Sequence, residues 1–569
     1  MLQMIKLASY LLGMSRSVKM SRLSLVGVMV TGLASGLAMA ALVAVINALI
    51  TGEGPASTVM MWAFLALVVA RPALRLVSQI LLLRLTEHSF YALRVDLCRR
   101  ILATPMRHLE ELGRARLMAG LSTDVGQVAS AMVLIPTLVM NAAVVIGFVA
   151  YLGWLSLPLL PLLFALTIIG WVTFKWAMQK AVDKIVVGRE LYDKLFQGFR
   201  AVTEGTKELK MHSRRREVFL ADLDKVSRDH RREIRHSDVA LAWLGTWSEI
   251  LFFVAIGFIL FAAPYFITVS HSVLSAYVLT VLMLRTPMEA LNNGLPTLAQ
   301  SAIAIKKIGD LTQDLGSRGA DVAPAEVVRP GAAWRELEMI GVTHTYRREA
   351  DDEHFVMGPI DLAFQPGELV FIVGGNGSGK TTLAKILLGI YGPEGGEIRL
   401  DGEVIDEAGR DRYRQHFSAV FSDFFLFESL MGMDSPDLDR AAGEYLEKLH
   451  LQHKVKVANG ELSTTDLSQG QRKRLALLGA YLEDRPIYLF DEWAADQDPQ
   501  FKEVFYLHLL PELKARGKTV LVISHDDQYY GVADRLVRVA DGVIQYDGDP
   551  AGYTGGRLLA DASEVALTA

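Results

Sequence analysis

Six stretches of predominantly apolar residues constrain this chain most, because each is about as long as a helix that crosses a lipid bilayer. Roughly 20 apolar residues are needed to span the hydrocarbon core. The run at 23–50 is also too long for the core of a cleaved signal peptide. We therefore predict six membrane-spanning helices, at residues 23–50, 58–83, 131–152, 157–177, 240–263 and 273–295.

The connections between these stretches alternate in charge. Residues 51–57, 153–156 and 264–272 contain no Lys or Arg, whereas the other two connections are long and basic. Lys and Arg accumulate on the cytoplasmic side of membrane proteins. The pattern predicts that both chain termini lie in the cytoplasm.

The two basic connections, residues 84–130 and 178–239, are too long for simple turns and have apolar residues at helical spacing. We expect them to extend the membrane helices into the cytosol. Short amphipathic segments at their tips, residues 113–123 and 196–208, either dock onto a soluble domain or form charged hairpins without a partner.

The remainder of the chain has a soluble composition, with Gly and charged residues throughout. We predict a membrane domain at 1–315, a Gly/Pro/Ala-rich linker at 316–333 and a soluble domain at 334–569. The formal net charge of -5 gives no indication of a nucleic-acid partner. Cys98 is the sole cysteine, which excludes a disulfide within the chain and a cysteine-based metal cluster.

Charged residues inside the predicted spans are candidates for lining a substrate cavity, because charge at that depth is costly and usually faces a bundle interior or water. A structural reading is also open: Arg75 can extend to the inner interface and Arg285 can pair with Glu289. The substrate-cavity candidates are Arg71, Arg75, Glu249, Arg285 and Glu289.

A phosphate-binding loop follows the apolar strand predicted at 369–373. The residues that follow satisfy the pattern G-x-x-x-x-G-K-[ST] and lead into a helix expected from Thr382. Glycines let the backbone amides and the helix N-terminus face phosphate oxygens, while the Lys reaches the terminal phosphates and the Thr hydroxyl suits Mg2+. The predicted nucleotide-contacting residues here are Gly374, Asn376, Gly377, Ser378, Gly379, Lys380, Thr381 and Thr382.

Two further buried strands are expected to deliver catalytic groups. The strand at 487–490 ends in Asp491, which can hold Mg2+, and Glu492, which can polarise an attacking water. The strand at 519–523 delivers His525, which can hydrogen-bond the γ-phosphate. A histidine in isolation is more often a satisfied core residue, and its position after a strand favours the catalytic interpretation.

Residues 467–471, Leu-Ser-Gln-Gly-Gln, precede a helix expected from Arg472 and resemble the LSGGQ signature of ABC ATPases. The resemblance implies that two ATP molecules are bound between the ATPase domains of a homodimer, with part of each site supplied by the partner. By the same resemblance, Tyr346 stacks on adenine and Asp498 ends the D-loop. The residues implied to contact the partner's nucleotide are Ser468, Gly470 and Gln471.

Two positions depart from that family. Gln469 replaces the first signature glycine, a change expected to be tolerated because Ser468 and Gly470 remain. Ser422 stands where most relatives have the Q-loop glutamine, so it is left out of the predicted metal ligands, which are Thr381 and Asp491.

The order of the parts is similar to an exporter-type ABC half-transporter. The resemblance implies a multidomain fold: an all-α six-helix transmembrane domain of the type I exporter kind, then an α/β P-loop ATPase domain with a helical signature subdomain. Residues 203–216, 422–423, 491–501 and 524–530 resemble bacterial cyclic-peptide and siderophore exporters of the syringomycin, pyoverdine and microcin type.

This resemblance implies an ATP hydrolase that uses ATP and Mg2+ and exports a small peptide-like substrate from the bacterial cytoplasm by alternating access, in contact with membrane lipid. A lipid or multidrug exporter is the alternative within transport. A channel or receptor regulator switched by ATP is the alternative outside it, although Glu492 argues for turnover. With about 22 residues before the first span, we expect no leader-cleaving peptidase domain.

Overall fold

The computed structural model describes residues 22–51, 58–267, 269–316, 333–347, 354–433 and 435–553. The chain divides into two compact units. The first unit comprises Met1–Arg99 and Ala115–Asp314, and the second comprises Arg100–Arg114 and Leu315–Ala569. The predicted linker at 316–333 lies outside the described residues except at its two ends.

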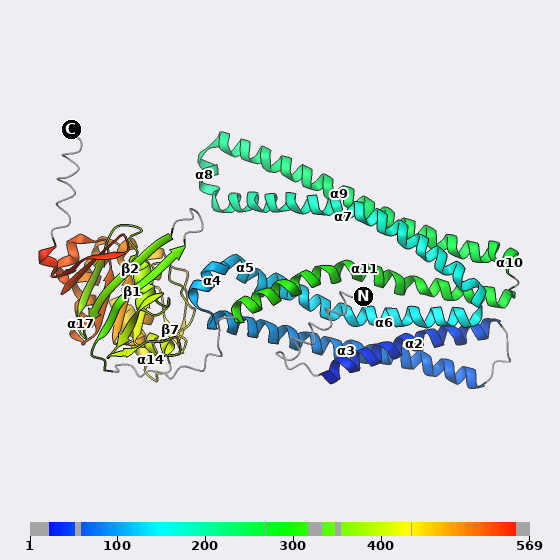
Figure 1. Cartoon of the computed structure of the whole chain (residues 1–569), viewed down its shortest axis with the longest axis horizontal. Helices are drawn as coiled ribbons and strands as arrows, with labels where there is room; N and C mark the ends of the chain where they lie inside the picture. The colour runs from blue at the N-terminus through cyan, green and yellow to red at the C-terminus, as the bar shows by residue number, and fades with distance from the viewer. Residues whose placement is uncertain are drawn as a thin grey trace. The chain divides into compact units, whose positions relative to one another are not determined.

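Long helices form the first unit (Figure 1). Their main pieces are α2 (Arg22–Thr51), α3 (Thr58–Ala103), α6 (Val125–Leu155), α7 (Leu160–Glu204), α9 (Ser213–Gly257) and α11 (His271–Gly316). The shorter pieces are α5 (Arg114–Ala119), η1 (Gly120–Asp124), η2 (Leu157–Leu159), α8 (Thr206–Met211), η3 (Phe258–Ala262) and α10 (Ala263–Phe266).

Each of the six predicted spans falls on helical structure. Within the described residues, five helical stretches are long and apolar enough to cross a membrane: Val26–Ile50, Thr58–Arg84, Arg114–Leu155, Ser213–Phe266 and His271–Gly294. A shorter apolar stretch, Leu157–Gly170, covers the first part of the remaining predicted span. The chain is therefore an integral membrane protein by the character of its helices.

A polar contact joins three of these helices inside their apolar core. Asn47 of α2 donates from Nδ2 to the hydroxyls of Tyr151 and Thr280, each at 3.2 Å, and to the carbonyl of Ala276 at 3.3 Å. Asn47 and Thr280 are buried. Hydrogen bonds between amide and hydroxyl side chains hold helices together in apolar surroundings. This contact therefore fixes α2 against α6 and α11.

The segment that joins α3 to α5 belongs with the second unit. Its helix α4 (Met106–Leu112) ends at Gly113, whose φ of 77° is in the left-handed region that glycine adopts most easily. Glu110 accepts hydrogen bonds from Lys385 Nζ at 2.9 Å and from the Tyr391 hydroxyl, and Arg107 pairs with Glu394. For residues 113–123 the sequence leaves open either docking or a hairpin without a partner. Most of the contacts come from α4, which precedes that range, and the contribution from within it is Arg114, 3.8 Å from Asp423.

The described residues of the second unit form three sheets. A six-stranded sheet has the order β12-β11-β3-β10-β9-β6, parallel except for the β11–β12 pair. A four-stranded antiparallel sheet has the order β2-β1-β4-β5, and β7 pairs with β8. The strands are β1 (Leu337–Arg347), β2 (His354–Phe364), β3 (Leu369–Val373), β4 (Gly395–Leu400), β5 (Glu403–Val404), β6 (Phe417–Val420), β7 (Val457–Ala458), β8 (Glu461–Leu462), β9 (Ile487–Asp491), β10 (Thr519–Ile523), β11 (Arg535–Ala540) and β12 (Val543–Gly548).

Helices cover the six-stranded sheet, and β3, β9 and β10 are buried along their whole length. Alternate residues of one strand pack into two separate cores: Phe371 into one, Val370 and Ile372 into the other. The helices of this unit are α12 (Lys380–Leu387), α13 (Arg410–Arg414), α14 (Leu438–Lys448), α15 (Gln469–Glu483), η4 (Trp493–Asp496), α16 (Pro499–Glu503), η5 (Val504–Leu509), α17 (Leu510–Ala515), η6 (Asp527–Val532) and η7 (Pro550–Gly552).

The sequence predicted these three strands closely. The bounds of β3 and β10 agree with the prediction, and β9 extends one residue further, to Asp491. Because β10 pairs in parallel with both β3 and β9, their carboxyl ends meet at one edge of the sheet. Ligands of open parallel sheets bind at that edge.

Candidate nucleotide-binding site

The phosphate loop connects β3 to α12. The helix begins at Lys380, two residues before the predicted start. Its N-cap Gly379 has a φ of 102°, at which the backbone of any residue with a side chain would be strained. Lys380 is 4% exposed, and its ammonium donates to the carbonyls of Gly374 at 3.0 Å and Gly375 at 2.9 Å. Burial lowers the pKa of Lys380, although the nearby carboxylates of Glu492 and Asp491 act in the opposite direction.

Ser378 provides a test of whether this loop suits an anion. Its hydroxyl is buried, and no hydrogen-bond partner for it is found within the described part of the chain. A buried polar atom without a partner is costly. A phosphate oxygen in the loop would satisfy it, so the residues present fit a nucleotide phosphate. The exposed Asn376 and Gly377 complete the turn.

Asp491 lies at the end of β9 and is fully buried. It accepts a hydrogen bond from the Thr381 hydroxyl at 3.3 Å, and the Ser422 hydroxyl lies at 3.5 Å from its other oxygen. Burial raises the pKa of Asp491, and the neighbouring charge of Glu492 raises it further. A carboxylate and a hydroxyl are oxygen ligands of the kind that Mg2+ prefers beside nucleotide phosphates, so the pair fits that ion.

Glu492 follows directly and faces His525. The distance from His525 Nε2 to Glu492 Oε1 is 3.1 Å, and Lys380 Nζ lies 3.9 Å from the same oxygen. His525 is exposed, which excludes the core-histidine interpretation. The three strand ends therefore bring together the ammonium, both carboxylates and the imidazole that the sequence predicted as one site.

The signature residues lie at the N-terminus of α15, which begins at Gln469, three residues earlier than predicted. Ser468 is its N-cap, accepting from the Gln471 amide at 3.4 Å while the Gln471 side chain accepts from the Ser468 amide at 3.3 Å. Ser468 is exposed. The Gln469 side chain donates to Asp496 at 3.2 Å, and the Gly470 carbonyl accepts from Gln497 at 3.1 Å.

Asp498 caps α16. Its carboxylate accepts from the Phe501 amide at 2.9 Å and pairs with Arg474. The Phe501 amide, followed by the charge of Arg474, lowers the pKa of Asp498.

Tyr346 lies on β1, but its side chain is outside the described part of the structure. Thr382 is half-buried in the first turn of α12.

Sequence reasoning missed a second group of polar residues beside this site. Lys473 of the signature helix pairs with Asp496, and Gln497 donates to the Gly470 carbonyl, so these residues join the signature helix to the segment after Glu492. Asp496 and Gln497 lie within residues 491–501, which resemble the peptide exporters, but that resemblance gives them no role, and no motif marks Lys473. The departure at Gln469 was a signal, because its side chain donates to Asp496 at 3.2 Å.

Of the five charged cavity candidates in the membrane helices, three contact one another. Arg285 pairs with Glu289 on its own helix α11 at 2.8 Å and with Glu249 of α9 at 3.0 Å. The Arg285–Glu289 pair is the contact that the structural reading of these residues allowed. Arg71 and Arg75 lie on α3, half-buried and exposed respectively.

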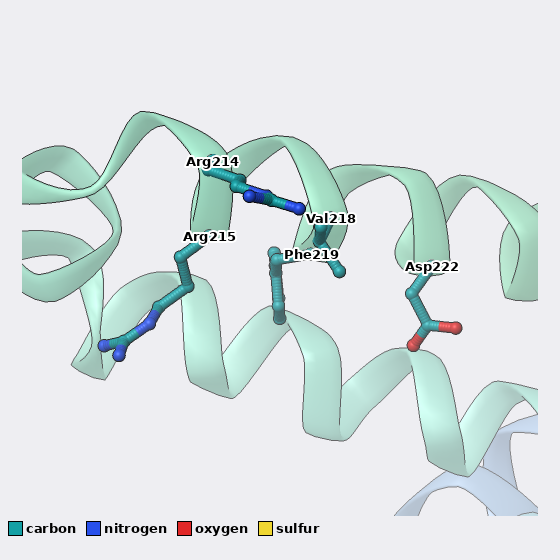
Figure 2. A pocket seen from close by; sticks show the side chains of 5 residues that line it. All are labelled: Arg214, Arg215, Val218, Phe219 and Asp222. Carbon is teal, nitrogen blue, oxygen red and sulfur yellow. The ribbon is translucent and has the colours of Figure 1, made fainter.

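An open hollow lies elsewhere, near the start of α9 (Figure 2). It measures about 540 Å3 and is lined by Arg214, Arg215, Val218, Phe219 and Asp222. None of the predicted nucleotide residues contributes to it. It is separate from the site at the sheet edge.

Two parts of the chain match known families. Residues 357–495 match the family described as ABC transporter, and residues 22–288 match the ABC transporter transmembrane region. The chain is 37% identical over 534 residues to the ATP-binding protein SyrD of Pseudomonas syringae pv. syringae, covering 91% of this chain and 93% of that one.

More distant relatives have other names. An ATP-dependent lipid A-core flippase of Thiobacillus denitrificans is 26% identical over 479 residues, with 79% of each chain covered. In fold, the chain is similar to a bacterial Atm1-family ABC exporter with ATP bound, with a TM-score of 0.70 and 17% identity over 96% of this chain and 98% of that one.

Proposed function

Because the chain belongs to the ABC transporter family, as an exporter half-transporter whose ATP hydrolysis is coupled to transport, we propose that it exports a small peptide-like molecule across the bacterial cytoplasmic membrane. The cargo is a cyclic peptide, a siderophore or a siderophore precursor. The observation that carries this substrate class is the 37% identity to SyrD over 91% of this chain, against 26% over 79% of this chain for the lipid A-core flippase of Thiobacillus denitrificans. It agrees with the resemblance of residues 203–216 and 491–501 to the peptide exporters.

The residues at the sheet edge would divide the chemistry among them. Backbone amides of the phosphate loop and the Lys380 ammonium hold the phosphates of ATP. Thr381 and Asp491 would hold Mg2+, which when bound neutralises charge on the phosphate oxygens. Glu492 orients and polarises the attacking water, and His525, 3.1 Å from Glu492, contacts the γ-phosphate.

We assign the second half of each nucleotide site to a second copy of the chain. Ser468, Gly470 and Gln471 occupy the N-terminus of α15, where the positive end of the helix dipole favours an anion. Ser468 is exposed, so a partner's nucleotide can reach it. In this homodimer, Asp498 lies at the boundary between the two ATPase domains, and Tyr346 stacks on the adenine of ATP.

ATP binding would then close the two ATPase domains, and hydrolysis would separate them. Helix α4 is held to the ATPase domain by Glu110 and Arg107, so it follows that motion. The membrane helices would alternate between inward-open and outward-open arrangements, with both termini in the cytoplasm. Arg71, Arg75, Glu249, Arg285 and Glu289 are the proposed cavity residues. The cluster of Arg285 with two carboxylates has one net negative charge, which favours a cationic group on the cargo.

The test of the catalytic assignment is Glu492→Gln in the full-length protein in lipid nanodiscs. The amide keeps the side-chain size but is a poor base, so ATP hydrolysis should fall on the order of 100-fold or more while ATP affinity is retained. Glu512→Gln, at an exposed carboxylate that pairs with Lys448, is the matched control and should hydrolyse normally. Native hydrolysis by Glu492→Gln would refute the assignment.

The substrate class is tested in the same nanodiscs by stimulation of ATPase activity with cyclic peptides, siderophores and lipids. We expect stimulation by the first two groups, together with ATP-dependent uptake of the stimulating compound into inverted vesicles. Stimulation by lipid alone would instead support the flippase alternative suggested by the relatives of that name.

A further inference from the structure

A buried lysine outside the recognised motifs links the catalytic carboxylate to the signature helix. Lys473 lies on α15, five residues after Ser468, and is 3% exposed. Its ammonium donates to the backbone carbonyl of Glu492 at 3.3 Å and pairs with Asp496 at 2.7 Å. A buried ammonium requires such partners, so its position is fixed by residues 492 and 496.

Glu492 needs this support because its backbone is strained. Its φ of 47° and ψ of 34° lie in the left-handed region, which residues other than Gly, Asn and Asp rarely adopt. Its amide donates to the Ile523 carbonyl at 3.0 Å, and its carbonyl accepts from Lys473. The Ala495 amide also donates to this carbonyl, at 3.3 Å. The direction of the Glu492 side chain depends on these backbone anchors, and Lys473 supplies the one that comes from α15.

The same ammonium reaches the signature residues through Asp496. The hydrogen bond from Lys473 is the main cause that lowers the pKa of Asp496, so this carboxylate stays charged. Its Oδ2 also accepts from the Gln469 side chain at 3.2 Å, and the neighbouring Gln497 donates to the Gly470 carbonyl at 3.1 Å. The N-terminus of α15 is thereby tied to the segment that follows Glu492.

The helix backbone at Lys473 is held as well. The indole of Trp493, which is buried, donates to the Lys473 carbonyl at 2.8 Å. Residue 473 therefore contacts both neighbouring residues 492 and 493, one through its side chain and the other through its carbonyl. This contact leaves little freedom for α15 to move relative to the end of β9.

We propose that Lys473 is a positioning residue for ATP hydrolysis, holding Glu492 for the nucleotide of its own protomer and Ser468 for the nucleotide of the partner. The proposal rests on the proposed function, in which these two residues of one chain serve different ATP molecules. In this dimer, a displacement of α15 on binding the partner's nucleotide reaches the Glu492 backbone directly through the Lys473 ammonium, and reaches the next residue through the Trp493 indole.

The experiment compares Lys473→Met with the native full-length protein in nanodiscs, measuring kcat and KM for ATP hydrolysis and the affinity for a fluorescent ATP analogue. Lys473→Met should lower kcat on the order of 10- to 100-fold, as expected for a misplaced catalytic group, with nucleotide affinity little changed. A kcat equal to that of the native protein would overturn the proposal.

Lys518→Met is the matched control. Lys518 is 8% exposed, donates to the carbonyl of Asp484 at 2.9 Å and pairs with its carboxylate at 3.0 Å, and Asp484 also has a left-handed φ of 49°. This arrangement lies at the opposite end of α15. Lys518→Met should lower the thermal midpoint but leave the kcat of the folded protein unchanged. An equal loss of kcat in both variants would mean that Lys473 acts only through stability.

Asp496→Asn covers the case in which Lys473→Met does not fold, because the Asp496 side chain is 45% exposed and tolerates the change. Replacing a charged acceptor by a neutral one should lower kcat by about fivefold with KM retained, and native kcat would count against the proposal.

Glu492→Gln is assayed in parallel. If it is inactive while the Lys473 and Asp496 variants are fully active, only the positioning role fails; if it hydrolyses ATP normally, the proposed function itself fails.

Discussion

Gly374 is the position where the fold leaves least room for a side chain. It joins β3 to the phosphate loop, and a Cβ there would lie 2.1 Å from the Val539 carbonyl oxygen and 2.8 Å from Ser378 Oγ. The first distance is about 1.3 Å short of the 3.4 Å at which ordinary contact begins. Because the obstructing atom is backbone of β11, which pairs with β3, relief requires the loop or the strand to move.

The cost of Gly374→Ala follows from that geometry. Overpacking of this kind costs about 1–3 kcal/mol, and loss of one hydrogen bond between β3 and β11 adds about 1 kcal/mol. For a domain of this size, a total of about 2–4 kcal/mol corresponds to a thermal midpoint lower by about 5–15 °C. The same displacement moves the amides that face the phosphates, so nucleotide affinity should fall as well.

The assay is thermal unfolding of the purified full-length protein with and without ATP, together with binding of a fluorescent ATP analogue. Gly443→Ala is the control, since Gly443 lies inside α14 and a Cβ there meets nothing within 4 Å. Alanine should stabilise that helix by about 0.5–1 kcal/mol. The reasoning about the β3–β11 contact fails if Gly374→Ala unfolds at the native temperature and binds ATP with native affinity.

Two further predictions concern charged groups of the site. Lys380→Ala removes the ammonium proposed to contact the terminal phosphates and should weaken ATP binding by at least about tenfold; unchanged affinity would count against the phosphate-loop assignment. The Phe501 amide, with Arg474, holds the folded-state pKa of Asp498 below its ordinary value of 3.8. This carboxylate therefore stabilises the fold above pH 3.8. That contribution is lost as the pH falls through the lowered pKa. Asp498→Asn should therefore be less stable than the native protein near neutral pH, by a margin that narrows below pH 3.8; a constant margin in thermal unfolding would contradict this.

The sequence predicted the site strands well because their burial is uniform. β3 is a continuous run of apolar residues, and β10 is apolar after its first residue, Thr519. Both lie inside a sheet with covered faces, and such runs are recognisable from hydrophobicity alone. Helix starts were predicted less well. The left-handed Gly379 precedes α12, and Ser468 caps α15 through its side chain, so both helices start earlier than the sequence pattern indicated.

Lys473 could not be recognised for a different reason. Its two partners are residues 492 and 496, which reach it only because β9 and α15 pack together. In the sequence, Lys473 is one of several basic residues on a helix, and nothing distinguishes it from an exposed charge. Docking by α4 was missed similarly, because the partners of Glu110 lie some 275 positions away along the chain.

Helix α4 also determines what a minimal soluble fragment would contain. A fragment starting at Trp334 would include Lys385, Tyr391 and Glu394 but would lack Glu110 and Arg107, which contact them here. The isolated domain would therefore present to solvent a surface that is covered in the intact polypeptide. Biochemical values measured on such a fragment would describe an ATPase without this part of its own structure.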